Sequence, residues 1–123
     1  MITAQYFNES EFKRCTPPCS LQDMNQSTMK RLDCARSIAG IPFVINSAYR
    51  TPEYEKAHGR KGTSSHTLGR AVDIRCNTSE NRYKIIKAAL ECGICRIGVG
   101  SNFIHLDNDG SLAQNVIFHY YNK

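Results

Sequence analysis

The chain has 123 residues, a length that supports one hydrophobic core and is too short for two independent cores. Hydrophobic residues make up 41% and charged residues 22%, so the composition excludes collagen-like, low-complexity and wholly disordered chains. The net charge of +5 suits an anionic partner, but the basic residues are scattered and no strand has the aromatic pattern of RNA-binding proteins. We therefore expect no nucleic-acid partner.

The N-terminal residues lack a basic stretch followed by an apolar one, so the sequence predicts no signal peptide. No segment has the length of a membrane span, and we expect no membrane partner. Synthesis in the cytoplasm is therefore expected, where the six cysteines should be reduced and form no disulfide framework. Buried thiols are the simplest interpretation, and the spacing leaves one alternative, a four-thiolate zinc site made of Cys15, Cys19, Cys92 and Cys95.

The sequence of the first half of the chain predicts two helices and a strand. Residues 1–25 look irregular. A helix is predicted over about 26–39, because apolar residues recur there at helical spacing and Gly40 follows. A buried strand is predicted over 43–45, which is rich in β-branched residues, and a short helix over about 52–57, which begins with proline.

The sequence of the second half of the chain predicts a polar loop over 58–65 and a strand over 71–75. It also predicts a helix over about 79–91, with Leu90 facing the core. Three short strands are predicted after it, over 96–99, 103–107 and 116–120. Helices interspersed among short strands predict an α+β fold. We expect a small single domain over 1–123, with a mainly antiparallel sheet and two main helices packed on it.

One stretch places an imidazole and a carboxylate on either side of a glycine turn that enters a strand. The turn is at Gly69, with His66 before it and Asp73 after it. Because side chains alternate along a strand, Asp73 should point away from the core-facing Val72. His66 and Asp73 can therefore face the same point.

The predicted strand over 103–107 repeats this pattern, because His105 and Asp107 share one face of it. If this strand lies beside the one that carries Asp73, then His66, Asp73 and His105 converge. Two neutral imidazoles and one carboxylate leave the fourth position of a tetrahedral zinc ion open for water, as in catalytic zinc sites.

The whole string Ser-x-His-x-x-Gly-x-Ala-x-Asp over 64–73, preceded by Ser-Ala-Tyr-Arg-Thr-Pro over 47–52, resembles a known family. It is similar to the zinc D-alanyl-D-alanine carboxypeptidases and their phage endolysin relatives, over about residues 5–110. The resemblance implies the small α+β fold that these peptidases share with the hedgehog signalling domain.

The resemblance also implies roles for individual residues. One zinc ion would be bound by His66, Asp73 and His105. Arg50 would stabilise the oxyanion or hold the substrate, and a guanidinium suits both tasks because it is always charged and can donate two parallel hydrogen bonds. Ser64 would bind the substrate or support a ligand, and Tyr49 would pack beside Arg50 as a wall of the substrate site.

The general base departs from the family pattern. Many members carry an acidic residue three positions before the last histidine ligand, or a histidine two positions before it, where this chain has Asn102 and Phe103. Asp107 is the remaining candidate for the base. Its alternative role is to orient His105 through the far nitrogen of the imidazole.

These observations predict a monomeric zinc metallopeptidase that hydrolyses peptidoglycan stem peptides. Either a D-Ala-D-Ala carboxypeptidase or an endolysin-like L-Ala-D-Glu endopeptidase fits, acting on the cell wall after release from the cytoplasm. The alternative is a noncatalytic module, stabilised by zinc, that binds cell wall or protein. The departure at the general base is what supports this alternative.

Overall fold

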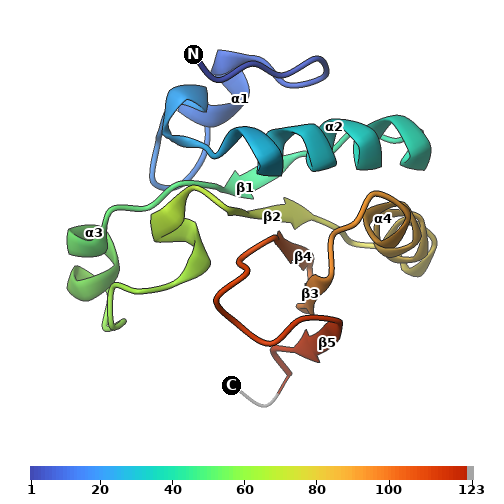
Figure 1. The fold of residues 1–123 in the computed structure, drawn as a ribbon. Coiled ribbons are helices and arrows are strands. Elements are labelled where there is room, and N and C mark those ends of the chain that lie inside the picture. The colour runs from blue at the N-terminus through green and yellow to red at the C-terminus, as the bar shows by residue number, and fades with distance from the viewer. Residues whose placement is uncertain (122–123) are drawn as a thin grey trace.

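A computed structural model describes the protein over residues 1–121 (Figure 1). The helices are α1 (Glu9–Lys13), η1 (Leu21–Asp23), α2 (Gln26–Ala39), α3 (Pro52–Ala57), η2 (Ser65–Leu68) and α4 (Ser79–Glu91), of which η1 and η2 are short 3₁₀ helices. The strands are β1 (Ile45–Ser47), β2 (Ala71–Arg75), β3 (Arg96–Val99), β4 (Phe103–Asp107) and β5 (Val116–His119).

The five strands form one sheet in the order β1-β2-β4-β3-β5. Neighbouring strands are antiparallel except β3 and β5, which are parallel. The two long helices, α2 and α4, pack against each other, and α4 also contacts β4 (Figure 1). The predicted α+β class, with a mainly antiparallel sheet and two main helices, is confirmed.

Side-chain alternation divides the sheet into two faces. The core face carries four fully buried aliphatic side chains, Val72, Ile74, Ile104 and Leu106. Leu32 of α2 and Ile85 of α4 belong to the same hydrophobic core. The residues between these aliphatic positions, among them Asp73 and His105, line a cleft on the other face. The hydrophobic core thus fixes which side chains of β2 and β4 reach the cleft.

The two long helices begin and end close to their predicted positions. At the start of α2 the Asn25 side chain accepts a hydrogen bond from the Thr28 N–H, and Gly40 ends the helix with a φ of 68°, which favours glycine. In α4 the buried residues are Ile85, Ala88 and Ala89, whereas Leu90 is 52% exposed. The prediction for Leu90 was wrong. Successive residues are rotated by about 100° around a helix, so Leu90, which follows the buried Ala89, lies outside the buried stripe.

Two short segments also differ from the prediction. The first 25 residues contain α1 and η1, and α1 is stabilised by a capping box between Asn8 and Glu11 and buries Phe12. A helix of this length is too short to give a periodic pattern. The predicted strand over 43–45 lies two residues later, at β1, because Ile45 is the first residue that pairs with β2.

One disulfide, between Cys34 and Cys92, joins α2 to the C-terminal end of α4. The expectation of six reduced cysteines was therefore wrong, because sequence spacing does not show that these two helices lie side by side. The alternative four-thiolate zinc site is also excluded, since the sulfur of Cys92 is bonded to Cys34. Cys15, Cys19 and Cys76 are buried thiols, as the simpler interpretation expected.

Candidate metal centre

Asp73 of β2 and His105 of β4 lie directly opposite each other in the antiparallel pairing of the two strands. Nδ1 of His105 is 3.0 Å from Oδ1 of Asp73. This contact follows from the register, because residues paired across two strands and on the same face bring their side chains together. The structure therefore confirms that the two strands are neighbours.

His66 reaches the same point from η2. Its Nδ1 lies 2.6 Å from the carbonyl oxygen of Ala48. Because a carbonyl can only accept a hydrogen bond, Nδ1 carries the proton and donates, and the free lone pair is on Nε2. That Nε2 lies 3.4 Å from Oδ1 of Asp73.

After η2 the chain turns into β2 at Gly69, where φ is 68° and a Cβ would lie 2.3 Å from the carbonyl oxygen of Asp23. Only glycine fits this turn.

The three residues form a group that fits a metal ion. One ligand atom from each of His66, Asp73 and His105 lies within 4.8 Å of the others. The two imidazoles are buried, and the Asp73 side chain is 15% exposed, on the cleft side. Two nitrogen ligands and one carboxylate oxygen, with the fourth side open to a cleft, are typical of hydrolytic metal sites.

Electrostatics in the group favour charged forms. Burial raises the pKa of the Asp73 carboxyl, but hydrogen bonds and charges from His105 and His66 outweigh it and hold the pKa well below its usual range. Burial lowers the pKa of His105, while Asp107 and Asp73 together raise it to about 9. A cation is therefore favoured beside Asp73, whether it is a proton on Nδ1 of His105 or a metal ion.

Asp107 lies on the same face of β4 as His105 and binds its far nitrogen. The Nε2–H of His105 donates to Oδ2 of Asp107 at 2.6 Å, and Nε of Arg96 donates to Oδ1 at 2.8 Å. The backbone N–H of Asp109 also donates to Oδ1, and the Asp107 side chain is 0% exposed. This is the geometry of the orienting role, and the role of Asp107 as a general base stays a prediction.

Arg50 lies beside the cluster and is held at three points. Its Nε donates to Oγ of Ser47 at 2.9 Å, and its two terminal nitrogens lie 3.3 Å from carboxylates of Glu55 and Asp73. The Arg50 side chain is 12% exposed. Its guanidinium is therefore fixed next to Asp73 at the edge of the cleft.

Glu55 of α3 is a residue that the sequence analysis missed. Its side chain is fully buried, binds Arg50, and accepts hydrogen bonds from the hydroxyl and the backbone N–H of Ser64. Burial raises the pKa of Glu55, but the hydrogen bonds from Ser64 and the charge of Arg50 outweigh it and lower the pKa overall. No local pattern distinguishes Glu55 from the exposed Glu53, so only the tertiary structure reveals it.

The cleft has a volume of about 390 Å³. Besides the three cluster residues it is lined by Arg50, Arg60, Ser64, Ser65, Arg96, Phe103, Asp107, Leu112, Phe118 and Tyr120. The structure therefore brings Arg50 and Ser64 to the cleft as predicted. Tyr49 instead packs against the hydrophobic core, and its place as a wall of the substrate site stays a prediction.

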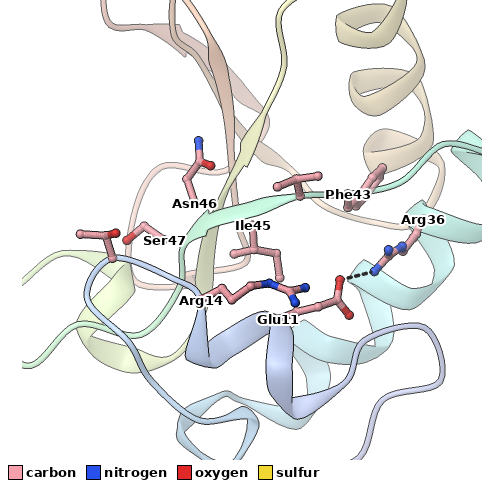
Figure 2. A pocket seen from close by; sticks show the side chains of 9 residues that line it. Glu11, Arg14, Arg36, Phe43, Ile45, Asn46 and Ser47 are labelled. Carbon is pink, nitrogen blue, oxygen red and sulfur yellow. Dashed lines mark hydrogen bonds and ion pairs between the residues drawn. The ribbon is translucent and has the colours of Figure 1, made fainter.

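A further cavity of about 660 Å³ lies between α1, α2 and β1 (Figure 2). Glu11 and Arg36 form an ion pair in it at 3.0 Å. None of the site residues predicted from the sequence lines this cavity. Ser47 lines this cavity and also contacts the cleft side, because its hydroxyl accepts the hydrogen bond from Arg50.

The small α+β domain thus carries a cluster of two histidines and one aspartate that could hold a metal ion. A family model described as Peptidase M15 matches residues 5–107, and the chain therefore belongs to this peptidase family. The resemblance seen in the sequence is confirmed at this level. No curated protein matches the chain. Among residues 1–121, no helix is long and apolar enough to cross a membrane.

Proposed function

We propose that the protein is a zinc-dependent peptidase that hydrolyses peptidoglycan stem peptides, acting as a monomer on the cell wall after release from the cytoplasm. The observation that carries the proposal is the convergence of His66, Asp73 and His105 on the cleft side of the sheet. Membership of a peptidase family supports the hydrolysis of a peptide bond.

Zinc would be held by Nε2 of His66, Nδ1 of His105 and the carboxylate of Asp73. A zinc ion there supplies a Lewis acid for the scissile carbonyl and lowers the pKa of a water molecule. The protein's own part is to fix the three donors in advance. Ala48 does this for His66 by accepting from Nδ1, and Asp107 does it for His105 by accepting from Nε2.

Arg50 would stabilise the negative charge that develops on the scissile carbonyl oxygen. Ser47, Glu55 and Asp73 hold its guanidinium in place, so little reorganisation is needed when that charge appears. Ser64 has a second role in this arrangement, because it binds Glu55 and so helps to position Arg50.

The charge of the cleft supports an acidic peptide as substrate. Arg50, Arg60 and Arg96 line it, and Arg60 is exposed at its edge. Three carboxylates, those of Asp73, Asp107 and Glu55, balance these guanidiniums. A bound divalent ion would therefore leave the cleft with a positive charge that attracts anions. Peptidoglycan stem peptides carry free carboxylates, both at a C-terminal D-alanine and on D-glutamate.

The test is mass spectrometry of purified peptidoglycan fragments after incubation with the zinc-loaded protein, with a metal-stripped sample alongside. Metal-dependent loss of one alanine would identify a carboxypeptidase, and a cut after the first alanine an endopeptidase. His66→Ala should abolish the products. The matched control is His58→Ala, because His58 is exposed and its Nδ1 faces only the carbonyl of Tyr54. A folded, zinc-containing protein that gives no products would favour the noncatalytic module.

A further inference from the structure

Part of the cleft comes from a segment that the family match does not cover. The match ends at residue 107, whereas β5 and Tyr120 follow it. β5 nevertheless joins the sheet next to β3, and the Tyr120 N–H extends the pairing by donating to the carbonyl of Val99 at 3.0 Å. This segment places Phe118 and Tyr120 in the lining of the cleft.

A glycine in β3 makes room for both rings. Gly98 pairs with His105 on one side and with Phe118 on the other. A Cβ at Gly98 would lie 2.6 Å from the Phe118 ring and 2.7 Å from the Tyr120 ring. Both rings therefore lie over the backbone of β3, and any side chain at position 98 would displace them.

The two rings lie against the metal cluster. The ring centroids of Phe118 and Tyr120 are 5.8 Å and 6.4 Å from the His105 imidazole. The Arg96 guanidinium carbon also lies 5.3 Å from the centroid of the Phe118 ring, so this ring packs between Arg96 and His105. Tyr120 continues the same wall, 5.1 Å from the ring of Phe103.

Within the described part of the chain, the Tyr120 hydroxyl is a polar atom of this wall with no hydrogen-bond partner. Among residues 1–121 it makes none of the hydrogen bonds of the site, although the Tyr120 side chain is half-buried in the cleft lining. A phenol keeps its proton at neutral pH, because the ordinary pKa of tyrosine is about 10. It is available as a hydrogen-bond donor.

We propose that Tyr120 is a substrate-binding residue, whose hydroxyl donates a hydrogen bond to an oxygen of the peptide that lies across the metal cluster. The inference rests on the proposed peptidase function. The cleft then offers the peptide two kinds of donor, the guanidinium of Arg50 and the neutral phenol of Tyr120. Phe118 differs from Tyr120 because its side chain has no polar atom, and its ring packs on His105, Arg96 and Tyr120.

The test compares Tyr120→Phe with Tyr121→Phe. The first variant removes the hydroxyl and keeps the ring. The second removes the hydroxyl of Tyr121, a residue that is 46% exposed and whose ring stacks on His119 outside the cleft lining. Tyr120→Phe should lower kcat/KM on stem peptides about tenfold, the usual size of the loss of one hydrogen bond to a bound substrate. Tyr121→Phe should have the kcat/KM of the wild type. Both variants should keep the zinc content and the midpoint of thermal unfolding of the wild type.

A second readout does not depend on the peptide substrate. Acetohydroxamate is a small chelator that mimics a scissile amide, and its affinity for the zinc-loaded protein can be measured by calorimetry. Tyr120→Phe should weaken this affinity several-fold and Tyr121→Phe should not. If the wild type binds acetohydroxamate but cleaves no stem peptide, the proposed substrate is wrong and the affinity ratio still decides the role of Tyr120. Equal affinities for wild type and Tyr120→Phe would overturn the inference, as would a wild-type protein that binds neither zinc nor the probe.

Discussion

The carboxylate of Asp107 lies 2.6 Å from Nε2 of His105, two residues away on the same strand. This contact turns the opposite nitrogen of the imidazole, Nδ1, toward Asp73. Arg96 and the backbone of Asp109 hold Asp107 in turn. The orientation of the His105 imidazole is therefore set by hydrogen bonds that extend from β4 to β3.

Asp107→Ala should weaken zinc binding by about 10–100-fold, the usual effect of removing a partner that orients a ligand histidine. Competition with a zinc-sensitive dye measures this affinity. The matched control is Glu53→Gln, an exposed acidic residue on α3, which should bind zinc like the wild type. A variant that keeps full zinc affinity and loses only hydrolysis would show instead that Asp107 is the general base.

Arg50→Lys should lower kcat about 100-fold and leave the zinc content unchanged. A lysine keeps the positive charge but cannot reach Ser47, Glu55 and Asp73 at once, because its three donors sit on one nitrogen. Steady-state kinetics on stem peptides measure the loss. Arg75→Lys, at the exposed end of β2, is the control. Equal kcat for Arg50→Lys and wild type would remove Arg50 from the catalytic residues.

The regular parts of this site follow from the sequence. The alternation in β2 and β4 places Asp73 and His105 away from the core, and the family-like string around His66 adds the third residue of the cluster. Glu55 could not be found in this way, because its burial depends on α3 packing against the loop that carries Ser64. Tyr120 was missed for a similar reason, since a terminal strand gives no sign of the strand beside which it pairs.

The stability of the protein should fall in acid because of Glu55. Its pKa is lower in the folded protein than its ordinary value of 4.5, so its contribution is present above pH 4.5 and is lost as the pH falls through the folded pKa. Glu55→Gln should therefore cost about 1–3 kcal/mol at pH 7 and flatten this acid dependence. Chemical unfolding between pH 3 and pH 7 measures both effects, with Glu53→Gln as the exposed control. Parallel curves for wild type and Glu55→Gln would contradict the assignment.

Reduction of the Cys34–Cys92 disulfide should destabilise the fold without changing the metal centre. The bond joins α2 to the end of α4 across 58 residues of chain, and the entropy of closing a loop of this length corresponds to about 4 kcal/mol. The double variant Cys34→Ser/Cys92→Ser should thus unfold at a lower denaturant concentration. Its zinc affinity should equal that of the wild type, because the bond lies on the helical side of the sheet and the cluster on the cleft side.

Cys95→Ser, which removes a free and half-buried thiol, is the control for the loss of a sulfur atom. If the double variant is as stable as Cys95→Ser, packing between α2 and α4 suffices and the disulfide adds nothing to the free energy of unfolding.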